Sequence, residues 1–177
     1  MKQVYPVSIQ SGMSQSGSCI LMLHEPQGNL QIPVIIGRGE AQSIILAQNP
    51  EECARLKRPM THQLMARMMN DYGLTLKRVT IDRVLEGVFF STLHVSDGFN
   101  EKAFDSRTTD AITLALLIDA PIYVDDAVLE ATGMPMAPPA EKPSSLEELE
   151  AELRRCEENE DYERAAEIQA AIEKLPR

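Results

Sequence analysis

The sequence of 177 residues contains no tryptophan, and aromatic residues make up only 5% of it. Proteins that bind single strands without sequence preference stack successive bases on aromatic side chains, so this class is disfavoured. A basic excess is also lacking, because 17 Lys and Arg stand against 27 Asp and Glu, for a net charge of −10. Tight, sequence-independent binding of phosphate backbones needs clustered cations. The composition therefore argues against that mode of binding, although a local basic patch is compatible with it.

Cysteines and long apolar runs are scarce as well. Cys19, Cys53 and Cys156 are odd in number and widely spaced, which disfavours a disulfide framework or a zinc site and favours reduced thiols. The longest apolar stretch, residues 111–124, contains Asp119 and Pro121 and is too short to span a bilayer. The first ten residues lack the apolar segment of a signal peptide. We therefore expect a cytoplasmic protein with no membrane partner.

A proline-rich segment divides the chain. Residues 132–145 contain four of the eleven prolines and little periodic apolar signal, which predicts an extended linker. We expect a main domain over residues 1–131, a linker over 132–143 and a helical tail over 144–177. Residues 1–135 carry a net charge of −4 and residues 136–177 a net charge of −6.

The main domain shows both strand and helix periods. Alternation predicts strands over residues 2–10, 19–25 and 30–37, and helical spacing predicts helices over 38–49 and 60–73, the second capped by Thr61 and ended by Gly73. A strand pair turning at Glu86-Gly87, a helix over 108–119, a short buried strand over 120–124 and a segment capped by Asp125 follow. This order predicts an α+β fold with a mixed, mainly antiparallel sheet and packed helices.

The tail has the pattern of a helical hairpin. Ser145 and Glu148 form a capping box, and Asp161 is a favourable cap for a second helix. Both predicted helices carry an apolar stripe, and helices this short are marginal alone, so the stripes must pack on each other or on a partner. A coiled-coil hairpin used for dimerisation and a hairpin used for docking another protein both fit this pattern.

The tail contains Leu149, Leu153, the run Asp161-Tyr162-Glu163, Ala165-Ala166, Ile172 and Leu175. In these residues it resembles the UVR motif, a short helical hairpin found in the UvrB and UvrC subunits of bacterial excision repair. The chain departs from this motif at Gln169-Ala170, where the family usually has Arg-Asp. The resemblance implies a protein-binding hairpin, and the residues that we expect to contact a protein partner are Leu149, Leu153, Tyr162, Ala165, Ile168 and Ile172.

Four segments of the main domain resemble the bifunctional nuclease family, whose plant members act on both RNA and DNA. They are "IPVIIGRGEAQSI" (32–44), "RPMTHQL" (58–64), "LKRVTIDRVLEGVFFSTL" (76–93) and "DSRTTDAITLALLIDAPIYV" (105–124). The resemblance implies an α+β domain, a homodimer or higher oligomer, and a nucleic-acid substrate. The chain departs from the family at Gln63, which is usually Asp, at Thr108-Thr109, usually Pro-Ser, and at Leu117, commonly Arg.

His62 is the strongest candidate for acid–base catalysis, because an imidazole exchanges protons near neutral pH. Cations surround it in the sequence, and they form the most basic stretch of the chain: Arg55, Lys57, Arg58 and Arg67. This pattern favours a phosphate-binding site in which the cations hold the substrate and His62 transfers a proton. The alternative is a structural histidine that caps its helix or bonds a buried carbonyl.

A metal-dependent nuclease needs carboxylates that converge on a divalent cation such as Mg²⁺ or Mn²⁺. Asp105 and Asp110 flank the start of the predicted third helix and are the candidate ligands, with Arg107 between them. A carboxylate in a helical first turn is also favoured by the helix dipole, and it could instead pair with Arg107. Glu40 is another first-turn carboxylate, interpreted as a helix start.

The leading hypothesis is a nuclease that hydrolyses phosphodiester bonds of DNA or RNA, with His62, Asp110 and Arg107 in its catalytic site. The alternative is a non-catalytic regulatory or scaffold protein that dimerises and recruits a partner through its C-terminal hairpin.

Overall fold

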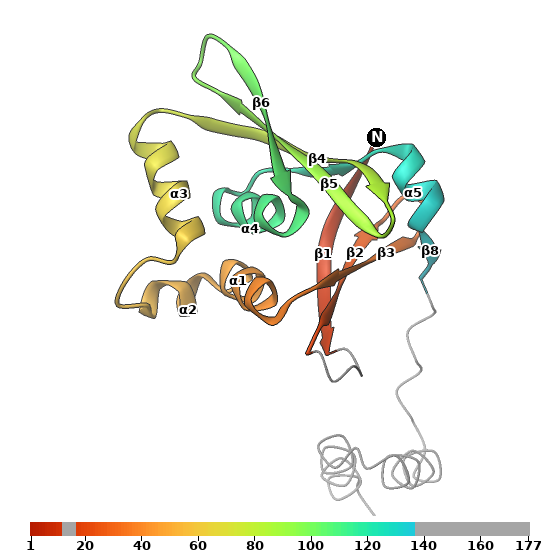
Figure 1. The fold of residues 1–177 in the computed structure, drawn as a ribbon. Coiled ribbons are helices and arrows are strands. Elements are labelled where there is room, and N and C mark those ends of the chain that lie inside the picture. Colours follow the sequence, from red (N-terminus) through yellow and green to blue (C-terminus); the bar gives the residue numbers. More distant parts are fainter. Residues whose placement is uncertain (12–16, 137–177) are drawn as a thin grey trace, which may run out of the picture. The chain divides into compact units, whose positions relative to one another are not determined.

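A single sheet of eight strands organises the chain in this computed structural model, which describes residues 1–11 and 17–136 (Figure 1). The strand order is β6-β5-β4-β7-β1-β2-β3-β8. The strands are β1 Lys2–Ser11, β2 Cys19–Glu25, β3 Leu30–Ile36, β4 Thr75–Leu85, β5 Val88–Ser96, β6 Glu101–Arg107, β7 Ile122–Val124 and β8 Met134–Pro135. Within the described residues β4 and β7 are parallel and the other neighbouring pairs are antiparallel. The predicted α+β fold with a mainly antiparallel sheet is confirmed.

Five helices accompany the sheet in the described part of the chain. They are α1 Arg38–Gln48, α2 Pro50–Arg55, α3 Thr61–Asp71, α4 Thr108–Ile118 and α5 Asp126–Thr132. The sequence pattern predicted α1, α3 and α4 as helices and α5 as a segment capped by Asp125, and it missed α2, a short helix with Pro50 at its start. Asp125 caps α5 as predicted, because its Oδ1 accepts a hydrogen bond from the amide of Ala127 at 3.0 Å.

Tight turns set the register of two hairpins. Glu86 and Gly87 have φ values of 51° and 80°, the left-handed conformation that both central residues need in a type I′ turn between β4 and β5. At the turn from β2 to β3, the buried carboxylate of Glu25 accepts hydrogen bonds from the amides of Gln27 and Gly28 at 2.9 and 2.5 Å. The turn thereby satisfies a carboxylate that would otherwise be buried without partners.

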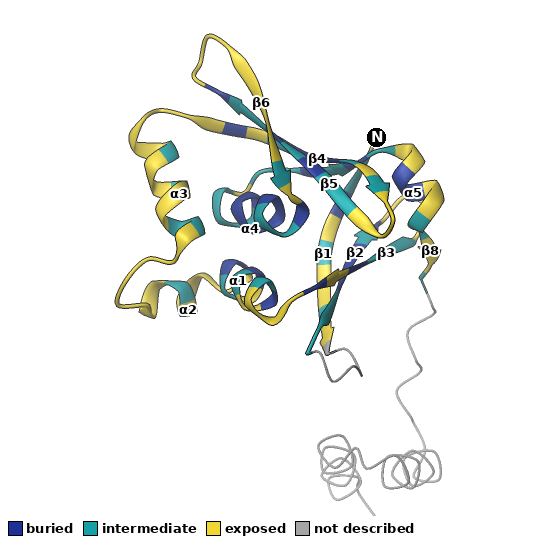
Figure 2. Ribbon diagram, viewed as in Figure 1, coloured by how far each residue is buried: buried dark blue, intermediate teal, exposed yellow. Residues whose placement is uncertain are grey.

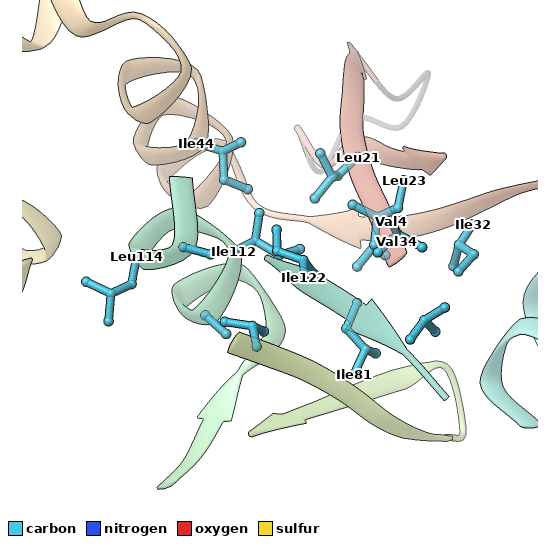
Figure 3. Packing of buried hydrophobic residues seen from close by; sticks show 14 of the residues in the cluster. Val4, Leu21, Leu23, Ile32, Val34, Ile44, Ile81, Ile112, Leu114 and Ile122 are labelled. Carbon is cyan, nitrogen blue, oxygen red and sulfur yellow. The ribbon is translucent and has the colours of Figure 1, made fainter. Parts of the chain in front are cut away.

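Helix α4 is the central helix of the domain. Six of its residues are buried, and it contacts α1, α3 and strands β4, β5 and β6. Figure 2 shows the contrast between this buried helix and the largely exposed α3. In Figure 3, Ile112 of α4 and Ile44 of α1 belong to the same cluster as Leu21 and Ile122 of the sheet. The start of α4 is therefore held rigidly over the sheet.

Helix α3 has the apolar face that its sequence predicts, but little of that face is buried. Leu64, Met65 and Met68 are 49%, 41% and 52% exposed. Thr61 is the first helical residue and not the cap: the helix starts after Met60, whose amide donates to Oε1 of Gln63 at 2.6 Å. The predicted end at Gly73 is confirmed by its φ of 68°, which favours glycine.

The C-terminal tail cannot be compared with its predictions. The described residues Met1–Met136 form one compact unit. The linker predicted over 132–143 begins within the described residues, where Thr132 ends α5 and Met134–Pro135 form β8 beside β3. Its residues 137–143 and the predicted hairpin over 144–177 lie outside the described residues.

Candidate catalytic site

A histidine–aspartate pair joins α3 to α4. His62 lies in the first turn of α3, Asp110 lies in the first turn of α4, and the two helices pack against each other. Nε2 of His62 is 3.0 Å from Oδ1 of Asp110, a hydrogen-bonding distance. Their side chains are only 16% and 28% exposed. The fold thus brings together two residues that the sequence singled out separately, and that lie 48 positions apart.

Arg107 fixes the orientation of Asp110. It is the last residue of β6 and directly precedes α4. Its Nε donates to Oδ2 of Asp110 at 2.6 Å and its Nη2 to Oδ1 at 2.9 Å, a two-point contact that suits the planar guanidinium. The pairing of Arg107 with Asp110 that the sequence allowed is therefore confirmed.

Glu40 joins His62, Asp110 and Arg107 in a charged cluster of four side chains. It lies in the first turn of α1, and its Oε1 accepts a hydrogen bond from Nη1 of Arg107 at 3.1 Å. Glu40 and Asp110 both occupy first turns, where the helix dipole favours a carboxylate. One arginine therefore ties together the starts of α1 and α4. No sequence pattern indicated this contact, because Glu40 lies 67 positions before Arg107.

The charges of the cluster stabilise one another. Burial alone would raise the pKa of Asp110, but hydrogen bonds from Arg107 and His62 and the charge of Arg107 outweigh it and hold that pKa below its usual value. The same contact raises the pKa of Arg107, chiefly through its hydrogen bond to Asp110. Asp110 is consequently ionised at neutral pH and serves as a fixed acceptor for the imidazole.

The cluster opens into a groove of about 870 Å³. Residues of α3, β5, β6 and α4 line it, together with the turn between β5 and β6. Its polar members include His62, Asp110 and Arg107, and its apolar members are Met65, Met69, Leu74, Leu93, Val95, Phe104 and Leu114. A volume of this size is typical of small-molecule sites, about 300–1,000 Å³. The dyad of His62 and Asp110 therefore faces a cavity large enough for a substrate.

The cations predicted to surround His62 lie elsewhere. Arg55, Lys57, Arg58 and Arg67 are exposed, and none of them lines the groove. Arg67 is 3.8 Å from Asp71 on α3 and borders a different hollow, beside α2. The cations that line the groove are Arg107 and Lys102. Sequence reasoning missed Lys102, because nothing in the exposed segment 101–107 marked it as a strand facing His62.

Asp105 and Asp110, the predicted metal ligands, line the same groove. The described residues contain no group of three or more His, Cys, Asp and Glu side chains that could hold a metal ion. Both oxygens of Asp110 already accept hydrogen bonds from Arg107, and one also accepts from His62. The carboxylate oxygens of Asp110, which would be the metal ligands, are therefore already bonded to the guanidinium of Arg107.

Two of the departures from the family pattern meet in one place. Gln63 and Leu117 both line a small hollow next to His62, together with Cys53. Gln63 bridges α2 and α3, because it accepts from Met60 and its Nε2 donates to Sγ of Cys53. Thr108 instead bonds the hydroxyl of Ser91 at 2.7 Å in the interior. These departures therefore leave the contacts among His62, Asp110 and Arg107 intact.

The remaining predicted site residues, Leu149, Leu153, Tyr162, Ala165, Ile168 and Ile172, lie outside the described residues. In the part of the chain that the structure covers, no helix has the length and apolar character needed to cross a membrane.

Comparison with known proteins agrees with the sequence resemblance of the main domain. Residues 21–137 match the family model of the bifunctional nuclease domain. Two Mycobacterium tuberculosis proteins, the uncharacterized proteins MT1877 and Rv1829 of two strains, are each 31% identical over 139 residues. The aligned region covers 78% of this chain and 81% of each relative. The matched region contains every member of the charged cluster and every residue that lines the groove, and the chain belongs to the bifunctional nuclease domain family.

Proposed function

We propose that this protein hydrolyses phosphodiester bonds of nucleic acids, with His62 as the general base. The observation that carries the proposal is the hydrogen-bonded chain from His62 through Asp110 to Arg107 at the wall of a large groove. A base held by a buried or half-buried carboxylate is a recurring arrangement for activating a nucleophile. Membership of the bifunctional nuclease domain family supports the choice of substrate.

In the proposed reaction, the carboxylate of Asp110 accepts a hydrogen bond from Nε2–H of His62, so the lone pair of the neutral ring is on Nδ1, which acts as the base. Nδ1 has no hydrogen-bond partner among the described residues. It removes a proton from a water molecule whose oxygen bonds to phosphorus, while the bond from phosphorus to the leaving oxygen breaks. The leaving oxygen takes up a proton from the imidazolium, which restores the neutral ring. Arg107 and Lys102 reduce the negative charge that develops on the phosphate oxygens.

A divalent metal bound by Asp105 and Asp110 stays a prediction. Mg²⁺ is often held by one or two carboxylates together with oxygens of the substrate phosphate, and Asp105 makes no salt bridge within the described residues. The contacts of Asp110 with Arg107 and His62 compete with such a role, and the reaction above assigns no step to a metal. Mg²⁺, Mn²⁺ and EDTA are accordingly separate arms of the test.

The test is cleavage of labelled DNA and RNA, single- and double-stranded, by the purified full chain. We expect His62→Ala to lower the rate about 100- to 10,000-fold, the usual contribution of general acid–base catalysis. His94→Ala is the matched control, because that side chain is 18% exposed and hydrogen-bonded but does not line the groove. Both variants are compared by circular dichroism to show that they fold.

Equal rates in the wild type and His62→Ala would contradict the proposal and would point to a contaminating nuclease. A loss of the same size in His94→Ala would also contradict it, since it would show a general loss of structure. Activity that survives EDTA would remove the metal from the mechanism.

A non-catalytic docking protein is the second candidate function. The observation that favours it is the exposed apolar surface of Leu64, Met68 and Tyr72 on and after α3, which are 49%, 52% and 78% exposed and do not line the groove. Large exposed apolar residues that lie together often mark a protein interface. Association through this helix, a homodimer in a cytoplasmic setting and recruitment of a partner by the predicted hairpin are parts of this proposal.

Sedimentation equilibrium distinguishes the two functions when it is combined with the cleavage assay. A docking protein would self-associate through α3, would become monomeric in Met68→Ser, and would cleave no substrate under any metal condition. Deleting residues 144–177 tests the separate contribution of the predicted hairpin. A monomer at all concentrations, with or without the tail, would contradict the homodimer.

A further inference from the structure

The walls of the groove are more apolar than phosphate binding alone requires. Met65 and Met69 of α3 line it, as do Leu93 of β5 and Leu114 of α4. Phe104 of β6 is 49% exposed and lines the same groove. An aromatic ring and thioether side chains form favourable contacts with flat aromatic groups. The groove therefore offers a nucleobase a surface on which to stack.

The charges of the groove limit how many phosphates it can bind. Lys102 and Arg107 are its cations, and Asp97, Asp105 and Asp110 are its carboxylates. Arg107 is already bonded to Asp110 and Glu40, whereas Lys102 makes no salt bridge within the described residues. Residues 1–135 as a whole carry a net charge of −4. The groove thus has enough positive charge to bind one phosphodiester, but not the successive phosphates of a longer backbone.

A double helix is a poor match for such a surface. Duplex DNA carries one negative charge for about every 1.7 Å of its axis, so a bound duplex needs many neutralising cations. The basic residues Arg55, Lys57 and Arg58 lie beside α2 and not along the groove. Bases in a duplex are also stacked on one another and cannot reach Phe104, unless free energy is spent to unpair and extrude one of them.

From these observations we infer that the groove binds one unpaired nucleobase against Phe104 with its adjoining phosphodiester beside Lys102 and the dyad, so that the substrate is a short or single-stranded nucleic acid and not a duplex. This inference rests on the proposed phosphodiester hydrolysis. It adds the class of substrate and the residues that select it.

Binding is measured first, because it does not depend on turnover. The full chain is titrated with fluorescently labelled oligothymidylate in EDTA, and with the same strand annealed to its complement. We expect the single strand to bind more tightly than the duplex. Phe104→Ala should weaken single-strand binding about 5- to 150-fold, the usual effect of losing one stacked base, and Phe104→Tyr should restore it.

Phe99 provides a matched control on the same hairpin. It lies in the turn between β5 and β6, is 96% exposed and does not line the groove. Phe99→Ala should leave binding unchanged. If Phe99→Ala and Phe104→Ala weaken binding equally, or if Phe104→Ala binds like the wild type, the base site is not where we place it and the inference fails.

The salt dependence counts the phosphates that are contacted. Each phosphate neutralised on a single strand contributes about 0.7 to the slope of log affinity against log salt, so one phosphodiester beside Lys102 predicts a slope of about 0.7. Lys102→Ala should reduce the slope by about 0.7, whereas Lys77→Ala, an exposed cation of β4 outside the groove, should not change it. A slope several times larger, or tighter binding of the duplex, would overturn the inference.

Cleavage then separates this inference from the function on which it rests. Single-strand binding that needs Phe104 without any cleavage would refute the nuclease and leave the base site standing. Cleavage that needs His62 but is the same in Phe104→Ala and on duplex substrate would refute the base site and leave the nuclease standing.

Discussion

The substitution Asp110→Asn tests whether the charged cluster holds α3, β6 and α4 together. Asn keeps the shape of the side chain but removes its charge, and one of its terminal groups can no longer accept hydrogen bonds. The wild-type carboxylate accepts two hydrogen bonds from Arg107 and one from His62. Hydrogen bonds to charged groups contribute about 1.5–3 kcal/mol each when well shielded.

Solvent reduces the expected size of the effect. Arg107 is 67% exposed, and exposed ion pairs contribute little, about 0–1 kcal/mol. The hydrogen bond to His62 is better shielded, since the two side chains are 16% and 28% exposed. We therefore expect the free energy of unfolding to fall by about 1–3 kcal/mol in Asp110→Asn, with a lower melting temperature.

The effect has a defined dependence on pH. The pKa of Asp110 is lowered in the folded protein, whereas in the unfolded chain an aspartate titrates near pH 3.9. The contribution of the carboxylate is therefore present in full above about pH 4 and is lost as the pH falls through the lower, folded pKa. The difference between wild type and Asp110→Asn should be constant near neutrality and shrink in acid.

Urea unfolding followed by circular dichroism measures this difference, since the chain has no tryptophan for fluorescence. Asp71→Asn is the matched control, because Asp71 is 60% exposed and 3.8 Å from Arg67, and its loss should cost less than about 0.5 kcal/mol. The reasoning is refuted if Asp110→Asn unfolds like the control at neutral pH, or if the difference grows as the pH falls.

Four further substitutions test the backbone and the interior by thermal unfolding. Gly73 and Gly39 both have open space where a Cβ would stand, but Gly73 has a φ of 68° and Gly39 lies within α1. Gly73→Ala should therefore destabilise the fold by about 1 kcal/mol, and Gly39→Ala should stabilise it by about 0.5 kcal/mol. Changes in unfolding free energy of the same sign in both variants would contradict this. Ser91→Ala removes the partner of the buried Thr108 hydroxyl and should cost about 1–3 kcal/mol. Adding Thr108→Val should recover part of that loss, and a strictly additive double variant would show that the two hydroxyls do not interact.

The sequence predicted the elements that carry their own local signals. Glu86-Gly87 marked the turn between β4 and β5, and Gly73 marked the end of α3. Strand β6 carried no such signal, because six of its seven residues are exposed and their polarity does not alternate. Its structure depends on the ladder with β5, and hydrogen bonding between backbones leaves little trace in the side chains.

The site was predictable residue by residue but not as an assembly. His62, Arg107 and Asp110 were identified from their chemistry, whereas the link from His62 to Asp110 depends on the packing of α3 against α4. Lys102 was missed because its place in the groove follows from the position of β6. Contacts across tens of residues arise only from tertiary packing, which a single sequence does not encode in its periodicity.

Strand β7 also has a consequence for how the protein folds as it is made. Its three residues pair with Lys2–Val4 of β1 on one side and with Val79–Ile81 of β4 on the other. The amino-terminal hairpin and the β4–β6 meander thus become neighbours in one sheet only after Ile122–Val124 has been synthesised. Pairings this distant in sequence slow folding, because the loop must close before they form. During translation, one edge of β1 therefore stays unpaired until β7, near the end of the domain, has been synthesised. A chaperone that shields that edge would shorten the time in which the chain can aggregate.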